Sequence, residues 1–270
     1  MSYRDFTHPA AARSKVGLGY WLDWMHEQGD ILVPVAPHHV LSCAHCFGAC
    51  RYRDDSDTWS LCWKCDRVYG AAVDTFVPIT YSLDFGLESM LHQYKDSGAA
   101  GQWLRRPLAA LLTTFVREHA DCIDHDARGI DLATAVPSDD PQRSFNHLQR
   151  LIDDTVAGNP VLNRFDWDLE AIARDPAVAR PPRGNLSPYA YVVDRRAVAG
   201  ATVLLLDDTW TSGSSAASAA AALKEGGALH VTVLTLGRQL NSGNHFGSSE
   251  ALIDDRAGAE WTLGDCVLCA

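Results

Sequence analysis

Two adjacent acids and a hydroxyl-rich loop form the most informative chemical pattern in this sequence. Asp207 and Asp208 follow the apolar run 202–206, and the loop after them contains Thr211, Ser212, Gly213, Ser214 and Ser215. The alanine-rich stretch 216–223 predicts a helix, whose N-terminal amides and dipole favour a phosphate dianion. The two carboxylates would repel that phosphate, but they can accept hydrogen bonds from the vicinal hydroxyls of a ribose. The pattern therefore predicts a site for a ribose 5-phosphate.

The same residues also fit a plain connection between a strand and a helix. In that interpretation Asp207 and Asp208 only end the strand, and Ser214 or Ser215 caps the helix. Trp210 either narrows the site or packs against the sheet, and we favour packing. For an isolated pattern of this kind the structural interpretation is favoured, and the family resemblance described below is what favours ligand binding.

Four cysteines form the second pattern. Cys43 and Cys46 are paired, Cys62 and Cys65 are paired, and fifteen residues separate the pairs. This spacing is typical of zinc ribbons, in which four thiolates hold one structural zinc ion. A redox pair or a cluster of buried thiols are the alternatives. Cys50 and His45 lie close enough in sequence to compete as ligands, and we interpret Cys50 as a spare thiol.

Other residues near these motifs have less certain roles. The aromatic residues Trp59, Trp63 and Tyr52 could stack on nucleic-acid bases, but we expect them to form the small core of the ribbon. Cys266 and Cys269 are half of a metal site, which could join Cys50, bind nothing or form a labile disulfide. Cys122 is interpreted as a core thiol.

Composition limits the classes of function. The chain has 270 residues, is 47% apolar and has a formal net charge of -11. This charge repels nucleic acid and phosphorylated ligands, so an anion needs local donors, a few basic side chains or a metal ion. No run approaches the roughly 18 to 20 apolar residues of a membrane span, and residues 1–12 do not resemble a secretory signal. We expect a cytoplasmic protein without membrane contact.

The elements that must position these residues are predicted by periodicity. After Gly129, strands are expected at 130–136, 202–206 and 230–236, and helices at 145–156 and 215–224, an alternation that predicts an α/β fold with a parallel sheet. The run 202–206 is apolar on both faces, as in a central strand. Apolar residues at three- and four-residue steps over 81–119 predict two amphipathic helices, separated at 98–101. The acidic stretch at the end of the sequence is expected to be a loosely attached tail.

These patterns divide the chain into five parts. We expect an N-terminal segment at 1–42, a zinc-ribbon-like module at 43–69, a helical hood or connector at 70–129, the α/β core at 130–240 and the acidic tail at 241–270.

Beyond these patterns, the sequence resembles a known family. All thirteen positions of 203–215 suit the phosphoribosyl diphosphate (PRPP) motif of type I phosphoribosyltransferases. Together with the cysteines, the motif resembles the ComF (competence protein F) family, from about Cys43 to Arg238. Weaker matches follow in the family's order: Tyr94-Lys95, Val136-Pro137, Arg143-Ser144-Phe145-Asn146, Arg183-Gly184-Asn185 and the run 234–238.

The resemblance implies a role for each matched residue. Asp207 and Asp208 would hold the ribose hydroxyls, the hydroxyl-rich loop would hold the 5-phosphate, and Pro137, Ser138 and Arg143 would face the pyrophosphate. Ser144 replaces the family's glycine, and Asp139 and Asp140 bring negative charge to the same loop. The pyrophosphate would then depend on Mg²⁺. Lys95 and Arg238 would either add positive charge or be solvated surface residues.

Three functions are compatible with these features. The first is an enzyme that transfers phosphoribosyl from PRPP to a base or amine, with charge stabilised by Mg²⁺ and loop donors. The second is a competence-type module that handles single-stranded DNA or a protein partner, with PRPP as a regulator. The third is a scaffold with a vestigial ligand site. Selectivity for the acceptor would depend on the hood before Gly129.

Overall fold

The structure is a computed structural model that describes residues 3–10, 17–29, 31–50, 52–54, 57–84, 86–96, 98–138, 147–156, 164–179, 181–243 and 250–269. Within these ranges, no helix is both long enough and apolar enough to cross a bilayer. The cytoplasmic location expected from the sequence stays a prediction.

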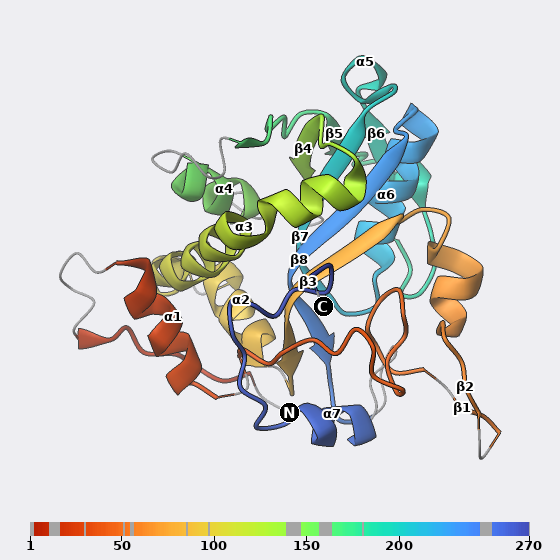
Figure 1. Ribbon diagram of the computed structural model, residues 1–270. Coiled ribbons are helices and arrows are strands. Elements are labelled where there is room, and N and C mark those ends of the chain that lie inside the picture. Colours follow the sequence, from red (N-terminus) through yellow and green to blue (C-terminus); the bar gives the residue numbers. More distant parts are fainter. Residues whose placement is uncertain are drawn as a thin grey trace.

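A four-stranded parallel sheet forms the centre of the molecule (Figure 1). The two central strands are β7 (Thr202–Trp210) and β8 (His230–Leu240), and both are apolar because helices cover both faces of the sheet. β4 (Leu132–Ala135) and β3 (Thr75–Leu83) are the edges, in the order β3-β8-β7-β4. The predicted α/β class with a parallel sheet is confirmed.

Two features of the sheet differ from the expected elements. β7 continues past 206 to Trp210, so Asp207 and Asp208 lie within the strand, where Asp207 pairs with Thr235 of β8. β3 was not predicted, because residues 70–129 were expected to be helical. β3 pairs in parallel with β8, with Phe76 opposite Val233. The sheet therefore gains an edge strand from residues before 130, where the core was expected to begin.

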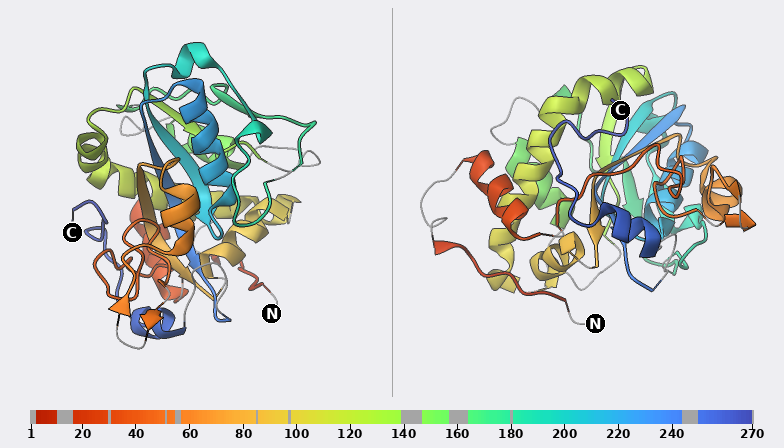
Figure 2. Two further views of the ribbon diagram at one scale, coloured as in Figure 1. Left: turned by 90° about the vertical axis from the view of Figure 1, so that its right-hand side faces the viewer. Right: turned by 60° about the horizontal axis from the view of Figure 1, so that its bottom comes forward.

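Helices cover both faces of the sheet, as Figures 1 and 2 show. On one face lie α2 (Gly86–Asp96), α3 (Arg105–Ala127) and α4 (His147–Val156), with α1 (Leu18–Glu27) packed on α3. On the other lie α6 (Ser214–Gly226) and the cysteine-rich segment. Side chains of β7 alternate between the two layers: Leu204 and Leu206 pack with α2 and α3, whereas Val203 and Leu205 pack with α6.

Short elements complete the fold. The cysteine-rich segment contains an antiparallel pair, β1 (Tyr52–Asp54) and β2 (Asp57–Thr58), and a π-helical turn, η2 (Cys65–Tyr69). The turns η3 (Gly98–Ala100) and η4 (Gln102–Leu104) join α2 to α3. Before β7 come the antiparallel pair β5 (Ile172–Arg174) and β6 (Tyr191–Val193), the turn η6 (Pro188–Ala190) and the helix α5 (Arg195–Val198).

The C-terminal segment is packed onto the core, so the expectation of a loosely attached tail is wrong. Leu252 of α7 (Glu250–Arg256) is fully buried, and Trp261 is 2% exposed. The Trp261 indole nitrogen donates a hydrogen bond to the Ile79 carbonyl of β3, with N and O 3.0 Å apart. The segment is attached because apolar side chains lie between its acids and are buried against the core. The sequence interpretation rested on the acids and overlooked these apolar residues.

Candidate functional site

A polar pocket of about 640 Å³ opens at the end of β7, next to the start of α6. It brings together all the expected ligand-binding residues that the structure describes: Pro137, Ser138, Asp207, Asp208, Thr211, Ser212, Gly213, Ser214 and Ser215. Arg143, Ser144 and the acids Asp139 and Asp140 lie outside the described residues. The pocket is therefore lined by the residues that follow β4 and by the C-terminal end of β7.

The loop between β7 and α6 depends on Gly213. Its φ of +78° lies in the left-handed region, and a side chain at this position would meet the Trp210 ring at 2.3 Å. Trp210 is 2% exposed and packs against Phe76, with ring centroids 4.5 Å apart, which confirms the packing role expected for it. Gly213 also leaves α6 without a capping side chain. The N-terminus of α6 thus borders the pocket, where the Ser214 amide makes a long hydrogen bond of 3.4 Å to the Ser212 hydroxyl.

Hydrogen bonds from outside the loop hold its backbone in place. The Tyr69 hydroxyl donates to the Ser212 carbonyl, 2.9 Å away, and burial raises the pKa of Tyr69 to about 12, so the donor proton is retained. The Ser214 hydroxyl accepts from the Gly184 amide at 2.5 Å and lies 3.0 Å from the Ser212 hydroxyl. Ser214 is 4% exposed. The Ser214 hydroxyl therefore stabilises the backbone of the loop. Ser212 and Ser215, in contrast, are half-buried and line the pocket.

Asp208 lies among basic groups that the sequence patterns did not connect to it. Its Oδ2 atom forms an ion pair with Lys95 of α2 and a hydrogen bond with His147 of α4, whose Nε2 atom is 2.7 Å away. The Thr209 hydroxyl donates to Oδ1 at 3.0 Å. Burial by itself would raise the pKa of Asp208, but Lys95 and His147 together hold that pKa well below its usual value. Asp208 is therefore a carboxylate at neutral pH.

The helices α2 and α4 bring these partners to the pocket. Tyr94, the residue before Lys95, is 1% exposed and its hydroxyl donates to the His147 carbonyl at 3.2 Å. Because Tyr94 is fixed, α2 presents Lys95 toward β7 and holds the first turn of α4. The sequence singled out Lys95 as a residue that would either add positive charge or be solvated, and the structure places it in the pocket.

Five further pocket residues were missed by sequence reasoning. They come from the N-terminal segment, α2, α4 and the connection between β5 and β6, and they are Tyr3, Glu88, His92, His147 and Arg183. Burial raises the pKa of Glu88, and its Oε2 atom has no hydrogen bond to the described part of the chain. Arg183 was noted only as a weak motif. The one sequence signal for Glu88 and His92 was their place on the amphipathic helix that carries Lys95.

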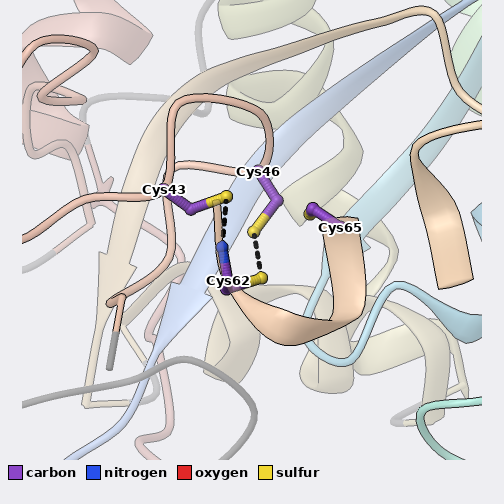
Figure 3. Close-up of side chains that lie close together, drawn as sticks. All are labelled: Cys43, Cys46, Cys62 and Cys65. Carbon is purple, nitrogen blue, oxygen red and sulfur yellow. Dashed lines mark hydrogen bonds between the residues drawn. The ribbon is translucent and has the colours of Figure 1, made fainter. Parts of the chain in front are cut away.

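The four predicted zinc ligands converge on one point (Figure 3). The sulfurs of Cys43, Cys46, Cys62 and Cys65 all lie within 4.8 Å of one another. Cys46 Sγ is 3.8 Å from Cys62 Sγ, and the Cys62 amide donates to Cys43 Sγ at 3.3 Å. These side chains are buried apart from Cys62, which is half-buried. Four sulfurs in this arrangement can hold a tetrahedral metal ion such as zinc. Cys50 and His45 are not in the group.

This cluster lies directly behind the loop of the pocket. Arg238 of β8, 1% exposed, donates through Nε to the Cys46 carbonyl at 2.9 Å and through Nη1 to the Trp210 and Thr211 carbonyls at 3.1 and 3.2 Å. Both roles proposed for Arg238 from the sequence are therefore wrong, because this side chain neither lines the pocket nor faces solvent. Lys64, between Cys62 and Cys65, donates to the Gly184 carbonyl.

Trp59 and Trp63 do not belong to the core of the cysteine-rich segment. Trp59 is 47% exposed and Trp63 is 65% exposed, so the expectation of a small aromatic core is wrong for both. The Lys64 ammonium lies 4.9 Å from the centre of a Trp63 ring. Tyr52 has no described side chain. The cysteine-rich segment packs instead through its cysteines, Phe47 and Tyr69.

Comparison with known proteins adds little to this geometry. No protein-family model matches the sequence, and neither does any curated protein. Among solved structures, the chain is similar to an allosteric regulatory enzyme of purine biosynthesis, with 16% identity, a TM-score of 0.30 and coverage of 55% of this chain and 34% of the other. It is also similar to glutamine PRPP amidotransferase from B. subtilis, with 16% identity, a TM-score of 0.29 and coverage of 56% and 35%. The aligned region thus spans about a third of each of those chains.

Proposed function

We propose that the pocket binds PRPP with Mg²⁺ and that the protein transfers the phosphoribosyl group to a nitrogen acceptor. One observation carries this proposal. Two adjacent buried carboxylates and an uncapped helix N-terminus, joined by a hydroxyl-rich loop with a left-handed glycine, line a single pocket. Acceptors for ribose hydroxyls and donors for a 5-phosphate thus line the same pocket.

Each side of the pocket has its own part in this proposal. The α6 amides with Thr211, Ser212 and Ser215 bind the 5-phosphate, and Asp207 and Asp208 accept from the ribose hydroxyls. On the other side, Pro137, Ser138 and Arg143 face the pyrophosphate. Lys95 and Arg183 add positive charge to the pocket, because Asp139 and Asp140 outweigh Arg143 in the 137–143 loop.

The carboxylates of the pocket also fit a magnesium ion. Mg²⁺ prefers carboxylate oxygens and retained waters, and Glu88 offers a buried oxygen without a hydrogen bond to the described residues. Asp207 and Glu88 would hold the ion directly or through water. When bound, the ion supplies charge neutralisation on the departing pyrophosphate.

The proposed transfer needs no covalent intermediate on the protein. A bond forms between the acceptor nitrogen and ribose C1, the bond from C1 to the pyrophosphate oxygen breaks, and the acceptor loses a proton. The chain's own residues hold both ends of the ribose phosphate, so the donors are already oriented when charge develops. The acceptor would enter beside α2, where Tyr3 and His92 stack with ring centroids 3.9 Å apart.

We also propose zinc at Cys43, Cys46, Cys62 and Cys65. Four thiolates leave no open position on the ion, so this zinc is structural. Its contribution to function would be indirect, through the hydrogen bonds that connect the cluster to the loop.

The decisive test of PRPP binding is thermal stabilisation. A ligand at a hundredfold excess over Kd adds about 2.7 kcal/mol, and each kcal/mol raises the unfolding midpoint by roughly 2 to 4 °C. We expect PRPP with Mg²⁺ to raise the midpoint by about 5 to 10 °C. Asp207→Asn with Asp208→Asn should remove most of this shift, measured against the variant's own midpoint without ligand.

A matched control is available in α7. Asp254→Asn with Asp255→Asn removes another adjacent pair of acids, both exposed and remote from the pocket, and should keep the full shift. A folded wild-type protein that shows no shift at millimolar PRPP and Mg²⁺ would contradict the proposal.

The exposed tryptophans favour a second candidate function. Trp59 and Trp63 could stack on bases of single-stranded DNA, in the competence-type role that the family resemblance implies, with PRPP as a regulator. The net charge of -11 opposes this role, so we expect weak binding that falls steeply with salt. Fluorescence anisotropy with a labelled oligonucleotide, repeated with Trp59→Ala and Trp63→Ala, measures it. Tight binding at physiological salt that both variants lose would rank this function above transfer.

A further inference from the structure

A second cluster of metal-binding residues lies far from the pocket. His119 and Cys122 of α3 meet Cys266 and Cys269 of the C-terminal segment, and their four ligand atoms lie within 4.8 Å of one another. Figure 2 (right) shows the dark-blue C-terminal trace reaching α3. From sequence, Cys266 and Cys269 were half of a metal site that could join Cys50, bind nothing or form a labile disulfide, and Cys122 was interpreted as a core thiol. The structure places Cys266 and Cys269 beside His119 and Cys122 and not beside Cys50.

The distances in this cluster suit a tetrahedral ion. Cys122 Sγ is 3.7 Å from Cys266 Sγ, and Cys269 Sγ is 3.6 Å from His119 Nδ1. Ligands about 2.0 to 2.3 Å from a tetrahedral zinc ion are separated from one another by roughly 3.5 to 3.8 Å. A disulfide would need a sulfur separation of about 2.05 Å, and all eight cysteines are free. The four groups are therefore spaced as ligands of one ion.

The orientation of His119 is independent support for a metal site. Its Nε2 atom lies 2.5 Å from the Leu263 carbonyl oxygen, which can only accept, so Nε2 carries the proton. In the neutral ring, Nδ1 then has a lone pair, and this atom is the one that faces Cys269. A backbone carbonyl that holds the distal nitrogen of a ligand histidine is the usual second contact at zinc sites. His119 is 6% exposed, so this orientation is built into the core.

Local structure brings each pair of ligands to one side of its segment. His119 and Cys122 are three residues apart in α3, so they share a helix face. Cys266 and Cys269 are also three apart, and the Cys269 amide donates to the Cys266 carbonyl at 3.0 Å, which closes a tight turn. Each pair is thus preformed as half of a four-ligand site.

We propose that His119, Cys122, Cys266 and Cys269 bind one Zn²⁺ ion, which fastens the C-terminal segment to α3. Three sulfurs and one imidazole nitrogen form a closed set that suits zinc, so the role is structural. The fastened segment is the one that carries Trp261 onto β3. This site does not depend on PRPP binding, and it raises the expected zinc content from one ion per chain to two.

Elemental analysis of the untagged protein, purified without chelators, tests the proposal. We expect two zinc ions per chain in the wild type and one in Cys269→Ser. Cys269 is exposed, so this substitution should leave the fold intact. Cys62→Ser should also retain one ion, and the double variant none. Cys50→Ser is the matched control, because Cys50 belongs to neither cluster and both ions should remain.

Equal zinc content in the wild type and Cys269→Ser would overturn the proposal, whatever Cys62→Ser does. So would a disulfide between Cys266 and Cys269 in the freshly isolated protein, detected by alkylation and mass spectrometry. Cobalt substitution gives a second measurement: tetrahedral Co²⁺ with thiolate ligands absorbs strongly in the visible range, and Cys269→Ser should lose about half of the wild-type intensity. An unchanged cobalt spectrum would also count against the site.

Discussion

The two cysteine clusters have the same kind of ligands but different relations to the pocket. The loop-side cluster (Cys43, Cys46, Cys62 and Cys65) lies behind the hydroxyl-rich loop, and Arg238 bonds to carbonyls of both. The terminal cluster (His119, Cys122, Cys266 and Cys269) joins α3 to the C-terminal segment. The difference indicates that, if each cluster holds a structural metal as proposed, its position relative to the loop, and not its ligand chemistry, would decide whether it supports the pocket.

Breaking the loop-side cluster should have the largest effect. We expect Cys62→Ser to lose one zinc ion and about 4 kcal/mol or more of unfolding free energy, because loss of a structural metal is among the most damaging single changes. The PRPP-dependent shift of the midpoint should disappear as well, since the loop loses its support. Metal analysis and thermal unfolding with and without PRPP measure these effects. A variant that lacks the ion but keeps the full shift would remove the link between cluster and loop.

Cutting the link without touching either cluster should have an intermediate effect. Arg238→Met leaves the buried carbonyls of Cys46, Trp210 and Thr211 without their donor, and we expect a loss of about 3 kcal/mol. Both zinc ions should remain, while the PRPP-dependent shift should fall. Arg238→Lys keeps the charge but not the fork of donors, so it should restore stability only in part. Full PRPP response in Arg238→Met would show that the loop is held by other contacts.

Breaking the terminal cluster should have the smallest effect on function. We expect Cys269→Ser to keep the full PRPP-dependent shift and to lose about 1 kcal/mol of global stability, because the change is confined to a local unit. Hydrogen exchange should increase over 257–269 and stay unchanged in the loop 211–215. If Cys269→Ser lost the PRPP-dependent shift of the midpoint as Cys62→Ser does, the two clusters would not differ in their relation to the pocket.

The sequence by itself determined the features that are encoded locally. The first half of β7, the loop 211–215 and the start of α6 are continuous in the chain, so residue type and periodicity were enough to predict them, although not the extension of β7 to Trp210. The same holds for the two cysteine pairs of the loop-side cluster, whose spacing reflects the geometry of their knuckles. The alternation of strands and helices after Gly129 predicted the parallel sheet for the same reason.

Only the tertiary structure decided which distant residues meet. His147 and Lys95 reach Asp208 from separate helices, and His119 lies 144 residues before Leu263, whose carbonyl orients it. β3 entered the sheet because an exposed edge of β8 was available to pair with it, which no local pattern records. A single sequence states which side chains are present, but long-range packing of helices on the sheet brings them together. For that reason the sequence showed Cys266 and Cys269 only as half of a metal site, and did not connect them to His119 and Cys122.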